Sequence, residues 1–130
     1  AEGHRPVAGG VFDFRAPRRI GRASERGGVD FNHNFCLATA TRAEPAFAAR
    51  LTAPGCPTLE IWTTQPGLQL YDGYKIRPAI GLDGRPMEPG DALALEAQGW
   101  PDAPRKPHFP SVRLDPGAVY RQVTEYRFSR

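Results

Sequence analysis

The stretch Leu93–Pro104, with the sequence LALEAQGWPDAP, decides how the fold is interpreted. Leu93 and Leu95 occupy alternate positions, which places both on one face of a β-strand and Glu96 on the other. A loop marked by prolines follows the strand. A carboxylate at the end of a strand, beside a small residue that leaves space, suits a general base. A solvated glutamate without a chemical role is the alternative, and spacing alone favours it because most glutamates are exposed.

The rest of the chain has the composition of short strands joined by turns. Its 130 residues predict a single domain over residues 1–130. The 14 glycines and 14 prolines argue against long helices. An Asp83-Gly84 pair predicts a tight hairpin turn. We therefore predict an all-β fold, an antiparallel β-sandwich, with strands over residues 29–39, 47–51, 59–64, 68–71, 93–96 and 120–128.

The basic residues give only weak support for a nucleic-acid partner. The net charge is +3, and the arginines are scattered apart from one early cluster: Arg15, Arg18, Arg19, Arg22 and Arg26. No motif that interleaves aromatic and basic residues accompanies this cluster. We therefore expect solvated loop charges and no nucleic-acid partner.

The two cysteines show neither CxxC spacing nor a metal-ligand pattern with the three histidines. Cys36 lies in an apolar run, which predicts a core thiol. A disulfide between Cys36 and Cys56 stays open, although nothing requires it. The sequence predicts no metal site.

No segment of the sequence has the character of a membrane span or a signal. The apolar runs fall well short of the ~20 residues that cross a bilayer, and no basic-then-apolar segment begins the sequence. We expect a cytoplasmic protein without a membrane partner.

The stretch around Glu96 resembles a known motif. Leu-Glu-Ala-Gln-Gly-Trp-Pro-Asp-Ala, residues 95–103, is similar to the L-E-T-Q-x-x-P-D-A signature of the aldose 1-epimerases, also called galactose mutarotases. The glutamate of that motif is the catalytic base of the family. The resemblance therefore implies that Glu96 is a catalytic base.

A second segment, Asn32-His33-Asn34-Phe35, resembles the D-H-N-F motif of the same family. The aspartate of that motif binds sugar hydroxyls, and this chain has Asn32 in its place. An amide can donate and accept hydrogen bonds to a hydroxyl, but it lacks the full charge of a carboxylate. The resemblance implies sugar binding by Asn32, with Asp30 as a weaker alternative. His33 falls on the apolar face of the predicted strand, which favours a structural role.

A third segment, Ile61–Tyr71, is similar to the family pattern W-T-T-x-P-G-L-Q-x-Y. The glutamine of that pattern contacts the sugar, so the resemblance implies that Gln69 binds substrate. Gln69 also alternates with leucines, which places it opposite the apolar face. Trp62 and Tyr71 could stack on a sugar ring, although aromatic residues in strands more often serve packing.

Two shorter segments also resemble the family. Phe12-Asp13-Phe14-Arg15 is similar to the family segment that precedes the substrate loop, and its phenylalanines could equally pin this loop to the core. Near the end of the chain, Pro116-Gly117 with Tyr120 resembles the family's P-G-x-x-Y.

The resemblance covers the C-terminal portion of a typical mutarotase. It implies the family's super-sandwich fold, of which this chain would be the C-terminal half, and a free aldohexose such as glucose or galactose as substrate. The family's acid is a histidine of the N-terminal half, and none of His4, His33 and His108 matches its motif. The chemistry needs no cofactor. We expect pairing with an N-terminal half or self-association, and a non-catalytic carbohydrate-binding or structural module is the alternative function.

Overall fold

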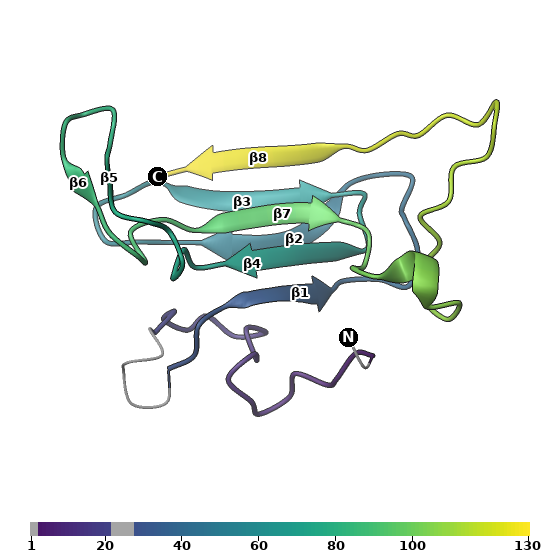
Figure 1. The fold of residues 1–130 in the computed structure, drawn as a ribbon, viewed down its shortest axis with the longest axis horizontal. Coiled ribbons are helices and arrows are strands. Elements are labelled where there is room, and N and C mark those ends of the chain that lie inside the picture. Colours follow the sequence, from purple (N-terminus) through teal and green to yellow (C-terminus); the bar gives the residue numbers. More distant parts are fainter. Residues whose placement is uncertain (1–2, 22–27) are drawn as a thin grey trace. The chain divides into compact units, whose positions relative to one another are not determined.

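The structure, a computed structural model, describes residues 3–21 and 28–130 of the chain (Figure 1). Short strands dominate this part, and its only helical element is one 3-10 turn. The all-β class predicted from the sequence is therefore confirmed. The elements are β1 (Asn32–Cys36), β2 (Ala46–Leu51), β3 (Thr58–Thr63), β4 (Gly67–Tyr71), β5 (Ala79–Ile80), β6 (Pro86–Met87), β7 (Ala94–Gln98), η1 (Ala103–Arg105) and β8 (Thr124–Ser129).

The strands form two three-stranded sheets and one two-stranded ribbon. The first sheet has the order β1-β4-β7, the second has the order β2-β3-β8, and β5 pairs with β6. Neighbouring strands run antiparallel (Figure 1). The central strands β3 and β4 are joined by the turn around Pro66, whose side chain is fully buried.

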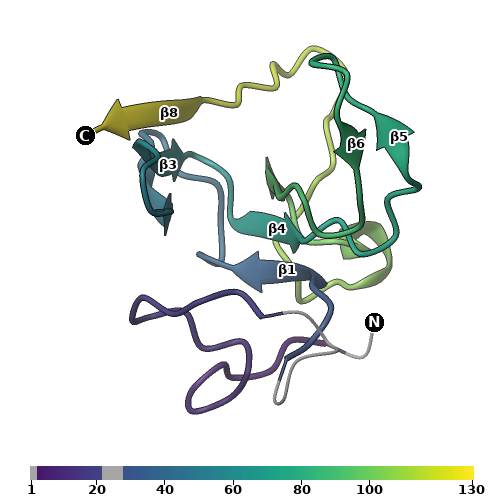
Figure 2. The same ribbon diagram turned by 90° about the vertical axis from the view of Figure 1, so that its left-hand side faces the viewer.

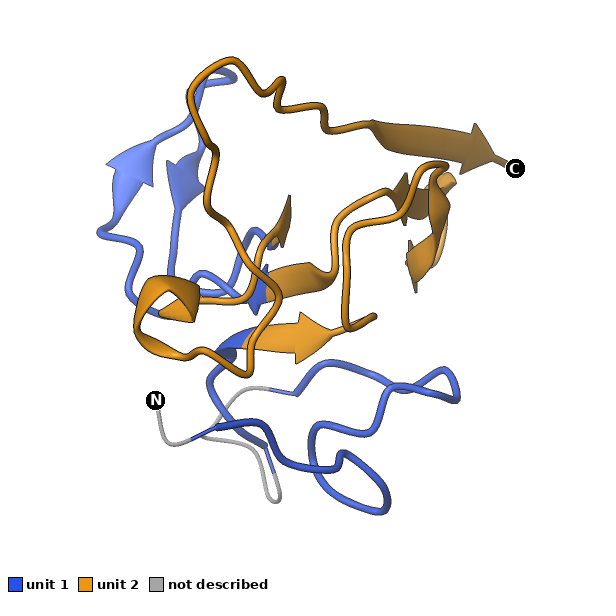
Figure 3. Ribbon diagram, turned by 90° about the vertical axis from the view of Figure 1, so that its right-hand side faces the viewer, with its two compact units in different colours: residues 1–33, 70–94 blue, residues 34–69, 95–130 orange. Residues whose placement is uncertain are grey.

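By its internal contacts the chain divides into two compact units, which Figure 3 colours separately. Unit 1 comprises Ala1–His33 and Leu70–Ala94, and unit 2 comprises Asn34–Gln69 and Leu95–Arg130. A single domain over residues 1–130 stays a prediction. Each unit is described by itself below.

Unit 1 is organised around Phe31, which is 2% exposed. The rings of Phe12 and Phe14 meet it edge-on at centroid distances of 5.7 and 5.5 Å, so both phenylalanines pin the early loop to this core. The buried carboxylate of Asp72 accepts hydrogen bonds from the backbone N–H groups of Phe31 (2.9 Å) and Tyr74 (3.1 Å). Asp72 thus ties the segment before β1 to the segment after β4.

The hairpin predicted from Asp83-Gly84 is confirmed. Gly81 donates its backbone N–H to the carbonyl of Arg85 at 2.8 Å, and the turn joins β5 to β6 (Figure 2). Gly84 has a φ of 77°, a conformation that glycine adopts without steric strain.

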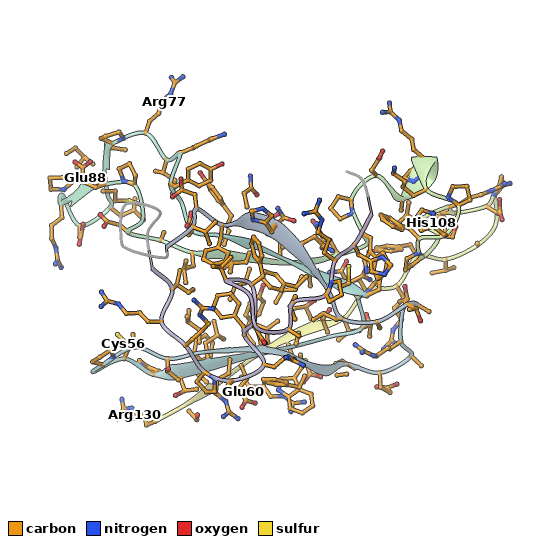
Figure 4. The ribbon with its side chains drawn as sticks, turned by 90° about the horizontal axis from the view of Figure 1, so that it is seen from below. Cys56, Glu60, Arg77, Glu88, His108 and Arg130 are labelled. Atoms are coloured by element: carbon orange, nitrogen blue, oxygen red, sulfur yellow. The ribbon has the colours of Figure 1, made fainter. Side chains whose placement is uncertain are left out.

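Unit 2 contains the whole β2-β3-β8 sheet, with β3 at its centre. Ile61 and Thr63 are 1% and 0% exposed, and Thr63 hydrogen-bonds across to Thr124 through their hydroxyls at 3.0 Å. The alternate residues Glu60 and Trp62 lie on the opposite face of this strand. Figure 4 labels Glu60, whose side chain lies on this opposite face of β3.

Two predicted strands are shorter in the structure, and one is more exposed than we expected. The first strand was predicted over residues 29–39 and spans Asn32–Cys36, since the N–H of Phe31 is bound by Asp72. The last was predicted over residues 120–128 as half-buried and spans Thr124–Ser129. It shortens because the N–H of Val123 bonds the Thr64 hydroxyl. Several of its side chains are exposed, because its apolar face is uncovered within the described residues: Tyr126 56% and Phe128 71%.

The prediction of a core thiol at Cys36 is wrong. Cys36 is exposed, because its strand position puts it on the polar face of β1 rather than with Phe35. Cys56 is also exposed, in the turn between β2 and β3 (Figure 4), and both cysteines are free thiols. No helix in the described part of the chain has the length and apolar character to cross a membrane.

The early arginine cluster is only partly described. Arg22 and Arg26 lie outside the described residues. Arg15 forms an ion pair with Asp13 at 2.8 Å, and this guanidinium holds the pKa of Asp13 well below its usual range. Arg18 lies over the ring of Phe14 at 5.5 Å. Arg15 and Arg18 thus engage groups of their own loop.

Candidate functional site

Alternation along β4 separates an apolar face from a polar one. Leu68 is 4% exposed, whereas Gly67 and Gln69 point to the other face of the strand. Gln69 is half-buried. The sequence-based prediction that Gln69 lies opposite the leucines thus agrees with the burial pattern.

Two amide side chains meet above Gly67 on this polar face. Gln98 of β7 donates from Nε2 to Oδ1 of Asn34 in β1, at 3.4 Å. A Cβ atom at position 67 would lie 2.6 Å from Asn34 Oδ1 and 3.1 Å from the backbone oxygen of Gln98. A Cβ atom here would therefore have to displace the Asn34 side chain and shift against the backbone oxygen of Gln98. We call the Asn34–Gln98 contact over Gly67 the amide bridge.

Glu96 precedes Gln98 by two positions in β7, so its side chain lies on the same face of the strand as Gln98. The residue is exposed. The structure records no hydrogen bond or ion pair of the Glu96 carboxylate within the described residues. The carboxylate is thus open to a ligand that approaches the polar face, which a general base requires.

The segment after β7 is firmly held within unit 2. Trp100, 6% exposed, donates its indole N–H to the carbonyl of Pro66 at 2.9 Å and packs edge-on against Phe109 at 5.0 Å. Asp102 adopts a left-handed conformation with φ 64° and starts the 3-10 turn η1. The PDA segment of the motif therefore forms a tight turn that anchors the end of the Glu96 strand.

Two of the three predicted site residues, Gln69 and Glu96, belong to unit 2, in the neighbouring strands β4 and β7. That they act together stays a prediction. Asn32 belongs to unit 1, at the start of β1, and is exposed. Its participation with Gln69 and Glu96 stays a prediction, as does the alternative at Asp30, which is half-buried ahead of β1.

The histidines take part in local packing. The ring of His33 lies 4.7 Å from that of Phe12, and its Nδ1 accepts the backbone N–H of Asn32 at 3.1 Å. His108 is exposed, as predicted, and packs against Phe109 at 4.7 Å. His33 is exposed, so its predicted place on an apolar face is wrong, although its ring packs on Phe12.

Of the two aromatic residues considered for sugar stacking, Trp62 serves packing. Its indole N–H donates to Glu60 at 3.0 Å, and the guanidinium of Arg127 lies over its ring at 4.1 Å. It belongs to the β2-β3-β8 sheet, a different sheet from that of Gln69. Tyr71 belongs to unit 1, where its hydroxyl accepts the N–H of Lys75 at 3.1 Å.

Sequence reasoning missed the amide bridge. Asn34, Gly67 and Gln98 lay within the quoted motifs but were given no role. Alternation along the strands carried part of the signal. It places Asn34 on the opposite face of its strand from Phe35, and Gln98 on the same face as Glu96. The contact across Gly67 needs the strand order β1-β4-β7, which no periodicity reveals.

In the part of the chain that the structure describes, no three or more histidine, cysteine, aspartate or glutamate residues lie together as metal ligands would. The arrangement defines an antiparallel β-protein whose polar sheet face carries an accessible carboxylate beside several amides.

Comparison with known proteins identifies the family to which this antiparallel β-protein belongs. The model of the aldose 1-epimerase family matches residues 2–127, and the chain belongs to that family. It is 40% identical over 126 residues to galactose mutarotase of Bos taurus and 39% identical over 127 residues to that of Homo sapiens, each match covering 95% of this chain and 36% of the relative. Aldose 1-epimerase of Escherichia coli is 31% identical over 134 residues, covering 98% of this chain and 39% of the relative. The chain thus spans little more than a third of the length of these relatives.

Proposed function

We propose that this chain supplies the catalytic base and part of the sugar-binding face of an aldose 1-epimerase. The substrate is a free aldohexose such as glucose or galactose, and the reaction interconverts its α and β anomers. The observation that supports the proposal is the exposed side chain of Glu96, in the family's motif, on the strand next to that of Gln69.

The chemistry follows from the acid–base needs of a hemiacetal. The Glu96 carboxylate takes the proton from the C1 hydroxyl while an acid protonates the ring oxygen, so the C1–O5 bond breaks and the ring opens. Rotation about C1–C2 and reclosure with the protons returned give the other anomer. No electrons leave the sugar, so the step needs no redox cofactor. Each well-placed acid or base contributes about 10²–10⁴-fold.

Hydrogen bonds orient the sugar for this step. Gln69 offers both an amide donor and a carbonyl acceptor, and Asn32 offers the same pair of groups. We propose that both bind ring hydroxyls. Because Asn32 lacks a full charge, its hydrogen bonds are weaker than those of the aspartate in the family motif.

The acid comes from elsewhere in this proposal. His33 and His108 are engaged in ring packing, and His4 lies outside the β1-β4-β7 sheet. Because the chain spans 36% of the length of its mammalian relatives, we propose that an N-terminal half of the same fold completes the site, with self-association as the other possibility.

Polarimetry tests the proposal. The optical rotation of freshly dissolved α-glucose or α-galactose is followed with this chain alone, with the chain plus an N-terminal half from a relative, and with a Glu96→Gln chain plus that half. We expect catalysis by the complemented pair and its loss in Glu96→Gln. A complemented pair that leaves the spontaneous rate unchanged would contradict the enzymatic role.

One observation favours a second function, a non-catalytic carbohydrate-binding module. Asn32 replaces the aspartate of the family motif. A chain that binds sugar in an NMR titration, with shifts at the Gln69 side-chain amide, but never accelerates anomerisation after complementation would establish this function instead.

A further inference from the structure

The last strand, β8, is an edge of the β2-β3-β8 sheet. All six of its residues pair with β3, from Thr124 opposite Thr63 to Ser129 opposite Thr58. Within the described residues no strand pairs with its other side (Figure 3). An exposed edge carries a row of backbone donors and acceptors that can pair with another strand.

The hydrogen-bond phase of β8 identifies which groups face the open edge. Thr64 donates its N–H to the carbonyl of Val123 at 3.0 Å, and these residues continue the register of the β3–β8 ladder. In an antiparallel ladder, hydrogen-bonded pairs alternate with non-hydrogen-bonded pairs. Glu125 and Arg127 therefore bond to β3, whereas Thr124, Tyr126 and Phe128 direct their N–H and C=O groups outward. These three outward residues are symmetric about Tyr126.

The side chains of β8 have the same symmetry. Glu125 and Arg127 lie on one face, one position to either side of Tyr126, and form an ion pair at 2.6 Å with exposed fractions of 42% and 50%. In an antiparallel pair of β8 strands centred on Tyr126, Glu125 of one chain would stand opposite Arg127 of the other. That pair would be of the close, non-hydrogen-bonded kind, in which opposite charges stabilise the sheet.

The other face of β8 is apolar and uncovered. Tyr126 and Phe128 stand opposite Ile61 and Leu59 of β3. Ile61 is 1% exposed, whereas Tyr126 and Phe128 are 56% and 71% exposed. A second β8 would bring Tyr126 against its symmetry copy and Phe128 against Thr124 of the other chain.

We infer that the open edge of β8 is a docking surface for a second copy of this chain. Two β8 strands pair antiparallel about a two-fold axis at Tyr126, and the sheet becomes a continuous six-stranded one. The hydrogen-bond phase, the complementary charges and the apolar pairs agree on this one register. The inference concerns the chain itself and does not depend on the proposed enzymatic function.

Disulfide trapping tests the register. Cys36 and Cys56 are exposed free thiols, so both are first replaced by serine. In that background Tyr126→Cys places two thiols in a hydrogen-bonded pair, with Cα atoms about 5.5 Å apart, within reach of a disulfide. Glu125→Cys is the matched control, because its two copies are offset by two residues and lie more than about 7 Å apart. We expect a covalent dimer from Tyr126→Cys only. A dimer from Glu125→Cys, or none from either variant, would overturn the register.

Proline substitutions test the edge without relying on charge. Tyr126→Pro removes an outward N–H and leaves the β3–β8 ladder intact, since edge strands tolerate proline whose nitrogen faces solvent. Sedimentation velocity should show a dimer for the native chain and a folded monomer for Tyr126→Pro, with Tyr126→Ala reporting the loss of the side chain alone. A dimer that survives Tyr126→Pro would contradict the docking surface.

Charge-reversal variants test whether a second copy of the chain, rather than an N-terminal half, pairs with the β8 edge. Glu125→Arg and Arg127→Glu should each weaken the dimer by about 2- to 30-fold, because each removes two cross-strand charge pairs. The double variant should restore the dimer, whereas Arg85→Glu in the β5–β6 turn should leave it unchanged. If the native chain is monomeric and β8 gains protection from hydrogen exchange only when an N-terminal half is added, the occupant is that half and the inference fails.

Discussion

Two glutamates in the strands of unit 2, Glu60 and Glu96, have opposite surroundings. Glu60 accepts two hydrogen bonds from Arg50, at 2.9 and 2.6 Å, and one from the indole of Trp62 at 3.0 Å. Glu96 is exposed, and no such partner is recorded for it among the described residues. Both occur in predicted strands with alternating patterns, so strand context does not distinguish them.

The difference shows what a carboxylate needs in order to act on a substrate. The lone pairs of Glu60 are occupied, and its pKa is lowered, first by the Trp62 hydrogen bond and then by Arg50. A carboxylate stabilised in this way is a weak base. Glu96 keeps its carboxylate oxygens available for a ligand. The comparison thus favours a structural role for Glu60 and leaves Glu96 suited to the catalytic role proposed above.

The largest expected effect separates the two glutamates in catalysis. Glu96→Gln should lower kcat/KM for anomerisation by the complemented chain about 10²–10⁴-fold, because an amide cannot accept the C1 proton. Glu60→Gln should leave kcat/KM within about twofold. Polarimetry measures both, and thermal denaturation of Glu96→Gln should match the native chain, since an exposed substitution usually changes stability by less than about 0.5 kcal/mol. An equal loss of activity in both variants would end the contrast.

The next effect concerns the glycine beneath the amide bridge. Gly67→Ala should destabilise the chain by about 1–3 kcal/mol, because its Cβ would meet Asn34 and the backbone of Gln98 and force the strands to shift. Urea denaturation measures the change, and sugar binding at Gln69 should weaken with it.

Gly99→Ala is the matched control for this variant. Its Cβ would lie just as close, 2.6 Å, to a neighbour, but that neighbour is the half-exposed side chain of Val112, which can rotate away. Similar losses of stability in the two variants would show that the amide bridge is not what makes position 67 sensitive.

A smaller effect is expected at Asn32. Asn32→Asp supplies the charge that the family motif carries, and hydrogen bonds to charged groups exceed neutral ones by about 1 kcal/mol. We expect about fivefold tighter sugar binding, measured by NMR titration. Asn34→Asp, a matched change in the same strand, should not tighten binding, because Asn34 is engaged with Gln98. Unchanged affinity in Asn32→Asp would exclude Asn32 from the sugar site.

Much of this arrangement was predictable from period-two alternation. Alternation placed Gln69 opposite the buried leucines and put Glu96 on the polar side of its strand, because side-chain direction is a local property of an extended chain. The Asp83-Gly84 hairpin was predictable for the same reason, since its turn needs only the residues within it.

The failures arose where a residue's environment depends on distant strands. Cys36 was assigned to the core from its apolar neighbours, yet its parity puts it on the polar face. Tyr126 and Phe128 have the pattern of a half-buried strand, but burial also requires a covering layer, which the described residues lack on that face. The amide bridge depends on which strands lie side by side, and alternation carries no information on strand order.

The smallest expected effect returns to Glu60 and concerns pH. Its folded-state pKa lies below its ordinary value, so the unfolded state binds the proton more readily. The stability that Glu60 contributes is therefore present above the ordinary glutamate pKa of about 4.3 and is lost as pH falls through the lower folded-state pKa. Urea denaturation midpoints should fall across this acid range in the native chain and fall less in Glu60→Gln.

Trp62→Phe keeps an aromatic ring but removes the indole N–H, whose hydrogen bond contributes most to the lowered pKa of Glu60. This variant should also reduce the dependence of stability on pH. The slope left in Glu60→Gln should decrease again in Asp13→Asn, because the pKa of Asp13 is lowered by Arg15. A Glu60→Gln chain with the full native pH dependence would show that the ion pairs around Glu60 do not stabilise the fold.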